Sequence, residues 1–143
     1  MNPIIRSILA VLLGSLITLV LVVGSQGISM VIFPLPEGFD PKDKEAMKAL
    51  MPTMPLAAKL LVLAGYAVGT LAGSWFSAWF ARRAPLVHAM IVGGIFLAGN
   101  IMNLIDIPHP LWMAVTSTLI FPVCAFVGAK LAGVPPKLPD ASV

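Results

Sequence analysis

Apolar residues fill four long runs of this chain, and polar and charged residues gather in the short stretches between them. About 20 consecutive apolar residues are enough for a helix to cross the ~30 Å hydrocarbon core of a membrane. Each run reaches about that length and holds no Asp, Glu, Lys or Arg. The pattern therefore predicts four membrane-spanning helices, at about residues 8–33, 60–81, 86–105 and 111–129.

The first run has a competing interpretation, because Arg6 precedes it and a basic residue before an apolar run is also typical of a secretory signal peptide. The apolar core of such a peptide is only about 7–15 residues long. The uncharged stretch 8–33 is longer, so we interpret it as a retained spanning helix.

Residues 34–56 interrupt the apolar pattern between the first two runs. Asp40 followed by Pro41 predicts a helix start, because aspartate caps free N–H groups and proline suits the first helical position. This helix is expected at about 41–51, ending before Pro52. Its apolar residues recur at helical spacing, which predicts a short amphipathic helix on the membrane surface or over the end of the bundle.

The composition agrees with a membrane protein, since 59% of residues are hydrophobic and 10% are charged, against roughly half and a quarter in soluble domains. We predict a single all-α domain over residues 1–143, an antiparallel four-helix transmembrane bundle with a short amphipathic helix in its first extramembrane loop. Its main partner is the lipid bilayer. The proline-rich tail at 134–143 is expected to be frayed.

Basic residues set the expected orientation, because lysine and arginine accumulate on the cytoplasmic side of membrane proteins. With four spans, both termini share one side of the membrane with five basic residues: Arg6, Arg82, Arg83, Lys130 and Lys137. The opposite side holds four: Lys42, Lys44, Lys48 and Lys59. We therefore expect both termini in the cytoplasm. A pI near 9.4 does not indicate nucleic acid, because the sequence offers no basic patch or aromatic platform.

Small residues recur at every fourth position of the second span, at Gly65, Gly69, Gly73 and Ser77. Inside a membrane such a ladder lets a second helix approach closely. The partner helix is expected to present small residues too, around Gly93 with Asn100 or around Gly128 with Cys124. The ladder then seals one chain, the alternative being a contact between copies in a homo-oligomer or a larger membrane complex.

Polar side chains inside the spans form a second candidate site. They are Gln26, Tyr66, Thr70, Asn100 and Asn103, with Asp106 at the end of the third span. Polar residues within a membrane are candidates for a functional site, here a groove that binds or passes an ion, lipid or small molecule. We favour the alternative, in which they form hydrogen bonds between helices.

Methionines in the loop helix suggest a third site, for Cu(I), because thioethers are soft ligands. The candidates are Met47, Met51 and Met54, with His109 expected at the same level. We favour the alternative that these methionines are apolar packing residues, and we expect no cofactor. We also expect no enzyme activity: His88 and His109 lie ~30 Å apart along a spanning helix, and no phosphate loop, HExxH or GxSxG motif occurs.

The loop Pro34-Leu35-Pro36-Glu37-Gly38-Phe39-Asp40-Pro41, between the first span and a glycine-rich second span, resembles a family of short bacterial four-span inner-membrane proteins. The likeness covers residues 5–133. The resemblance implies a bacterial inner membrane and carries no activity or functional residue, because the family is uncharacterised. We therefore predict a non-catalytic membrane protein, an accessory or self-associating subunit held by small-residue packing.

Overall fold

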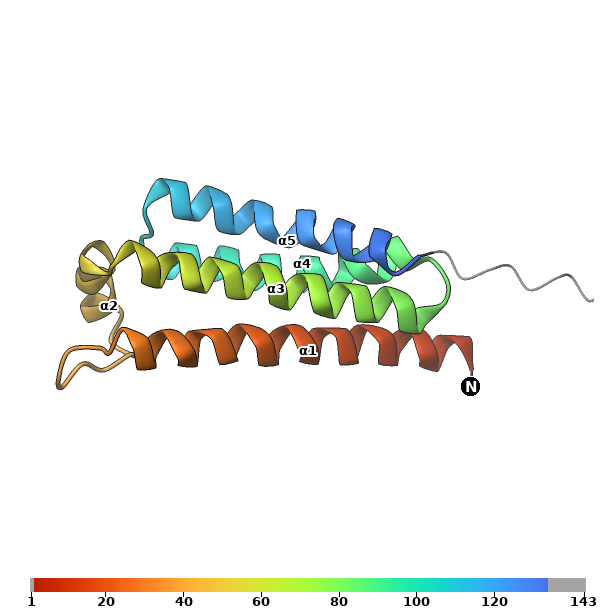
Figure 1. The fold of residues 1–143 in the computed structure, drawn as a ribbon, viewed down its shortest axis with the longest axis horizontal. Coiled ribbons are helices and arrows are strands. Elements are labelled where there is room, and N and C mark those ends of the chain that lie inside the picture. The colour runs from red at the N-terminus through yellow and green to blue at the C-terminus, as the bar shows by residue number, and fades with distance from the viewer. Residues whose placement is uncertain (1, 134–143) are drawn as a thin grey trace, which may run out of the picture.

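A computed structural model describes residues 2–133 of the chain, and it is built from helices packed side by side. Four long helices are α1 (Pro3–Ile32), α3 (Leu56–Ala81), α4 (Pro85–Asp106) and α5 (Leu111–Leu131), and each is long and apolar enough to cross a membrane. The loop after α1 carries α2 (Lys44–Leu50) and the 3-10 turn η1 (Met51–Thr53). Successive long helices run in opposite directions (Figure 1). The antiparallel four-helix bundle with a loop helix is thereby confirmed; the predictions for 134–143 and Lys137 lie outside the described residues.

Two spanning helices begin earlier than the apolar runs that predicted them. α1 begins at Pro3 because the Asn2 side chain accepts a hydrogen bond of 2.8 Å from the Ile4 N–H, and proline needs no such partner. α3 begins at Leu56, directly after Pro55. The helix therefore includes Lys59, which directly precedes the span predicted at 60–81.

The loop helix begins three residues later than predicted, and its cap is Asp43 rather than Asp40. The Asp43 carboxylate accepts hydrogen bonds from the backbone N–H groups of Glu45 and Ala46, at 3.0 and 3.2 Å. Asp40 instead accepts from the Lys42 N–H at 2.9 Å and closes a turn. An aspartate that bonds the backbone two residues onward forms such a turn in place of a helix start.

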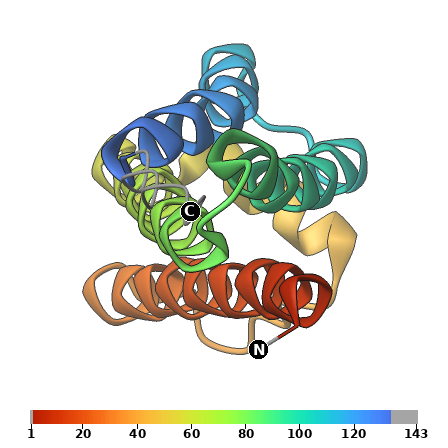
Figure 2. The same ribbon diagram turned by 90° about the vertical axis from the view of Figure 1, so that its right-hand side faces the viewer.

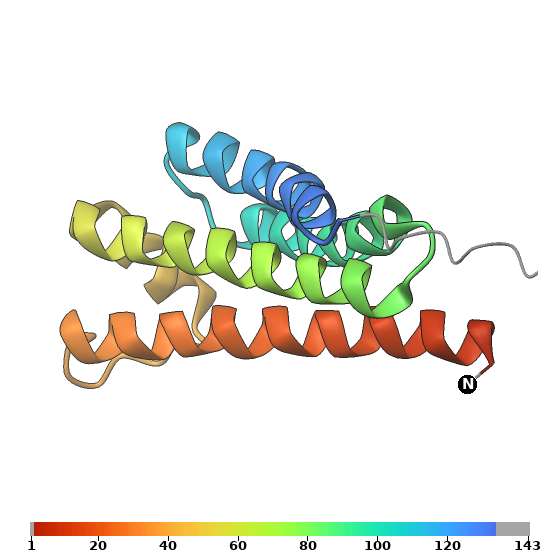
Figure 3. The ribbon, with the colours of Figure 1, turned by 45° about the vertical axis from the view of Figure 1, so that its right-hand side comes forward.

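The central helix of the bundle is α3, which packs against all three other long helices. Viewed end-on, α3, α4 and α5 form a cluster and α1 lies along one side of it (Figure 2). α1 and α3 run side by side over most of their length (Figure 3), whereas α1 contacts α4 less extensively. The α1–α3 pair is thus the most extensive interface in the bundle.

Small side chains fill the interior, and large apolar side chains cover the outside. The largest fully buried side chains are Val92, Thr18, Thr70, Ser74, Ser77 and Ser117. Leu12, Val31 and Ile105, in contrast, are more than half exposed. This distribution suits helices surrounded by lipid, where close backbone packing replaces the burial of large apolar side chains.

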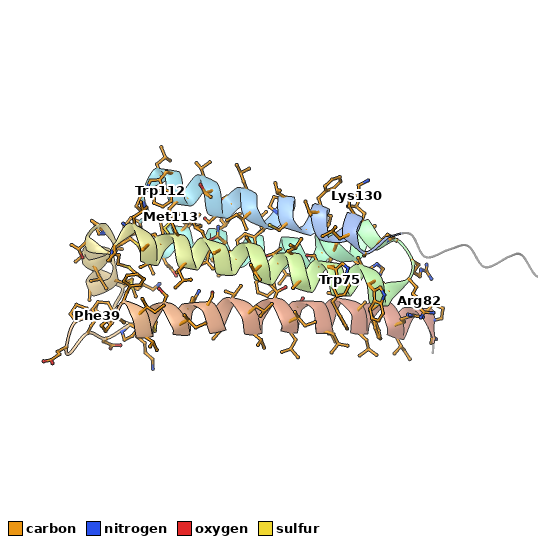
Figure 4. The ribbon with its side chains drawn as sticks, viewed as in Figure 1. Phe39, Trp75, Arg82, Trp112, Met113 and Lys130 are labelled. Carbon is orange, nitrogen blue, oxygen red and sulfur yellow. The ribbon has the colours of Figure 1, made fainter. Side chains whose placement is uncertain are left out.

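The two ends of the bundle differ in charge. One end, here called the basic end, holds Arg6, Arg82, Arg83 and Lys130. The other, the loop end, holds every acidic residue among 2–133: Glu37, Asp40, Asp43, Glu45 and Asp106. Figure 4 shows Arg82 and Lys130 at one end, and Phe39 and Trp112 at the other.

Candidate functional site

The interface between α1 and α3, here called the α1–α3 seam, is made of small residues on both helices. It consists of Gly14, Thr18, Val22 and Ser25 on α1 and of Gly65, Gly69, Gly73 and Ser77 on α3. A Cβ atom at Gly69 would lie 3.0 Å from Val22 Cγ2 and 3.1 Å from the Thr18 carbonyl oxygen. A Cβ atom at Gly65 would overlap the Ser25 hydroxyl. The glycines are therefore required by the close approach of the two helices.

The predicted ladder thus packs within one chain, but its expected partners were wrong. It faces α1, not the surfaces around Gly93 or Gly128. The physical reason is that α1 supplies its own small residues at the same spacing, Gly14 and Thr18. That four-residue spacing was visible in the first span, and it is the signal that the sequence analysis missed.

Gly93 and Gly128 close the remaining interfaces. A Cβ atom at Gly93 would lie 2.6 Å from the Ala125 Cβ of α5, so this glycine joins α4 to α5. A Cβ atom at Gly128 would lie 2.9 Å from the Trp75 backbone nitrogen, so Gly128 joins α5 to α3. The α1–α3, α4–α5 and α3–α5 interfaces therefore all meet at glycine or small hydroxyl residues.

The α3–α4 interface follows the same rule with a serine. The Ser74 hydroxyl of α3 donates a hydrogen bond of 3.3 Å to the Ala89 carbonyl oxygen of α4, and both residues are fully buried. Serine is small enough for close packing, and it adds a polar contact that lipid cannot replace.

The six predicted groove residues occupy separate places in the structure. Asn100, which is buried, donates from Nδ2 to the Ser117 Oγ at 3.1 Å, and this bond joins α4 to α5. Tyr66 of α3 contacts the Gln26 side chain of α1, and its ring centroid lies 5.4 Å from that of Phe121 in α5. The polar residues therefore bridge pairs of helices.

The remaining groove residues do not join these contacts. Thr70 is fully buried, and its hydroxyl has no hydrogen-bond partner within 2–133. Asn103 is half-buried, and its backbone carbonyl accepts from the Ile107 N–H at 2.9 Å. Asp106 is exposed at the loop end, where it accepts from Lys44 Nζ at 2.8 Å. The pockets described on the chain are lined by other residues.

Ser117 and Lys59 are two of the buried polar residues that the sequence analysis left out of the site. Ser117 is the partner of Asn100, and nothing in its sequence context distinguished it from neighbouring Thr116 or Thr118. Lys59 is only 8% exposed although it lies in the first turn of α3. Its neighbours Leu56 and Leu60 are exposed, so Lys59 lies on the inward side of the first turn of α3.

The methionine candidates belong to the loop end. Met51 is buried, and Met47 and Met54 are half-buried, as expected of apolar packing residues. His109 donates from Nδ1 to the Ile107 carbonyl oxygen at 2.7 Å. Within residues 2–133, no cluster of three His, Cys, Asp or Glu side chains is suited to hold a metal ion.

These observations define the class of the molecule, a multi-pass α-helical membrane protein whose helices are joined by small residues. No protein-family model, curated protein or solved structure shows a significant match to the chain.

Proposed function

We propose that this chain is a non-catalytic membrane protein that acts by association, as an accessory subunit of a larger membrane complex or as a self-associating subunit. The observation that carries the proposal is the packing of the interior. Glycine and serine close the interfaces between the long helices, and Asn100 is paired with Ser117. Such an interior favours a role performed by the outer surface.

The outer surface offers sites where another helix would fit closely. A Cβ atom at Gly94 or at Gly99 of α4 would meet no heavy atom within 4 Å, so these glycines face outward. A glycine inside a helix is destabilising relative to alanine, and at Gly94 and Gly99 no close contact within the chain compensates for that cost. This argument favours α4 as the first surface to alter when association is tested.

The test is the mass of the native assembly. The protein is extracted from its own membrane with a lipid-retaining polymer, and its mass is measured by native mass spectrometry. We expect an assembly heavier than the 15.1 kDa single chain, with a defined ratio of components, and a lower mass for Gly94→Leu. Ala64→Leu is the matched control, because it adds a leucine side chain to an exposed position on α3. A single chain with bound lipid alone contradicts the proposal.

A second candidate is binding or permeation of a small molecule or ion along the polar side chains. Its support is the half-buried pair Gln26 and Tyr66, which places two hydrogen-bonding groups inside a spanning region. Flux into liposomes tests it, with Gln26→Leu and Asn100→Leu as variants. Unchanged flux in folded variants rejects this candidate. Binding of Cu(I) by the methionines Met47, Met51 and Met54 is tested by titration of the purified protein, and absence of binding rejects it.

For the orientation, we propose a bacterial inner membrane with both termini in the cytoplasm. The charge difference between the two ends supports this, because basic residues favour the cytoplasmic side. In a Cys124→Ser background, Asp40→Cys should react with an impermeant maleimide in intact cells, whereas Arg83→Cys should not. The opposite labelling pattern reverses the orientation.

A further inference from the structure

An apolar groove lies between α1 and α4 near the basic end of the bundle. Its volume is about 340 Å³, and it is lined by Ser7, Ile8, Val11, Leu12, His88 and Ile91. Three of these side chains, Ile8, Leu12 and Ile91, are also exposed on the lipid-facing surface of the bundle. A chain of methylene groups entering from the membrane would therefore find a continuous apolar surface.

One polar group in this groove has a free hydrogen-bonding position. His88 is 7% exposed, and its Nδ1 donates to the Ala84 carbonyl oxygen at 3.0 Å. A carbonyl oxygen only accepts, so Nδ1 is the donor in this bond and Nε2 is left for another partner. No residue within 2–133 hydrogen-bonds to this nitrogen. A hydroxyl group at the top of the groove would complete its hydrogen bonding, with Ser7 as a second polar neighbour.

Three arginines lie close to the groove in the sequence and belong to the same end of the bundle. Arg6 directly precedes Ser7, and Arg82 and Arg83 lie in the short connection that leads into α4. Both connection arginines are exposed, and all described acidic residues lie at the loop end. Arg6 uses Nε to bind the Phe80 carbonyl oxygen at 2.6 Å, so its terminal nitrogens remain available. The basic end therefore has a positive charge that the described part of the chain leaves uncompensated.

We propose that this groove is a binding site for an anionic phospholipid, with one acyl chain between α1 and α4 and the phosphate against Arg6, Arg82 and Arg83. The apolar lining provides affinity for the acyl chain, and the arginines provide selectivity for a negative headgroup. A glycerol headgroup also supplies the hydroxyl that His88 Nε2 is able to accept from. This inference concerns lipid binding and stands independently of the proposed association.

The first experiment uses the unaltered protein. It is reconstituted with phosphatidylglycerol that carries a photoreactive group near the carbonyl end of one acyl chain, and the crosslinked peptides are identified by mass spectrometry. We expect crosslinks concentrated on residues 7–12 and 88–91. Crosslinks spread evenly over the exposed faces of all four long helices overturn the proposal.

The second experiment blocks the groove. Val11→Trp fills it from α1, and Val127→Trp places the same bulk on the exposed surface of α5, outside the groove. Native mass spectrometry of protein exposed to equal amounts of phosphatidylglycerol and phosphatidylcholine counts the lipid retained. We expect Val11→Trp to lose the retained lipid and Val127→Trp to keep it. Equal retention by both variants overturns the proposal. If Val11→Trp fails to fold, the crosslinking result on the unaltered chain decides.

The third experiment tests the charge. Arg82→Gln with Arg83→Gln removes two positive charges from the basic end, and Lys42→Gln with Lys48→Gln removes two from the loop end. We expect the preference for phosphatidylglycerol over phosphatidylcholine to fall by about fivefold for each arginine removed. The lysine variant should keep the preference of the unaltered protein. If both variants lose the preference for phosphatidylglycerol equally, the preference depends only on net charge. That result overturns a specific headgroup site.

Discussion

Gly14 of α1 and Gly73 of α3 face each other across the bundle so closely that a Cβ atom on Gly14 would lie 2.6 Å from the Gly73 carbonyl oxygen. The relationship is mutual, because a Cβ atom on Gly73 would overlap the Gly14 carbonyl oxygen and the Thr18 hydroxyl. Two of the obstructing groups are backbone atoms, which cannot rotate away. This contact fixes the separation of α1 and α3 at this point of the α1–α3 seam.

A single methyl group at Gly73 should therefore destabilise the protein. We expect Gly73→Ala to lower the free energy of unfolding by about 1–3 kcal/mol, the usual cost of overpacking a closely packed interface. Gly24→Ala is the control, since a Cβ atom there meets nothing within 4 Å. Its effect should stay within about 1 kcal/mol, the difference in helix propensity between the two residues. Unfolding in mixed detergent measures both, and equal effects would contradict the described packing.

Much of the fold follows from the pattern of apolar residues, because a membrane requires long uncharged helices and tolerates few other structures. The helix starts were less predictable. Asn2 and Asp43 gain their roles from hydrogen bonds to backbone N–H groups, whereas Asp40, an equally good cap by type, closes a turn. Residue type alone does not decide between these two local structures.

The hydrogen bond between Asn100 and Ser117 should contribute to stability as a pair. In a double-mutant cycle of Asn100→Ala and Ser117→Ala we expect a coupling energy of about 0.6–1.7 kcal/mol, the range for hydrogen bonds between membrane helices. Thr116→Ala is the matched control, because the Thr116 hydroxyl bonds to Trp112 within its own helix. Coupling between Asn100 and Thr116 should be near zero. If the coupling energy between Asn100 and Ser117 is no larger than that between Asn100 and Thr116, the hydrogen bond does not contribute to stability.

The candidate site was harder to predict than the fold, because a membrane sequence shows which residues are small or polar but not which helix each one faces. The small residues of Gly65–Gly73 were visible, yet their partner depends on how the long α1 lies along α3. In the same way, Asn100 was a clear candidate, but its bonding to Ser117 depends on the rotation of α5 about its axis.

The ion pair between Lys44 and Asp106 should hold the loop helix to the bundle without adding much stability. The Nζ–Oδ1 distance is 2.8 Å, and both side chains are more than half exposed, so water and salt weaken the pair. We expect Asp106→Asn to increase amide hydrogen exchange in residues 44–53 and to leave the midpoint of global unfolding nearly unchanged. Adding salt to the unaltered protein should have the same local effect. Glu45→Gln, which removes the Lys48 partner within α2, should not alter exchange at Asp106.

The contact between Arg6 and Phe80 should hold the start of α1 against the end of α3. Arg6 Nε donates to the Phe80 carbonyl oxygen at 2.6 Å, and the guanidinium carbon lies 5.4 Å from the centre of the Phe80 ring. Carbonyl groups in the last turn of a helix have no partner within that helix, so Arg6 satisfies one of them. Lysine keeps the charge but has no Nε–H placed along its chain to make this bond.

We therefore expect Arg6→Lys to lower the free energy of unfolding by about 1 kcal/mol, the net value of a hydrogen bond. Amide hydrogen exchange should also increase in residues 3–10 and 78–81, the two segments that the contact joins. Arg83→Lys makes the same chemical change at an exposed position of the same end and should leave both quantities unaltered. Both variants retain their charge, but only Arg6→Lys loses the bond to Phe80. If the two variants behave alike, loss of that bond has no measurable effect, and the charge of Arg6 holds α1 in place.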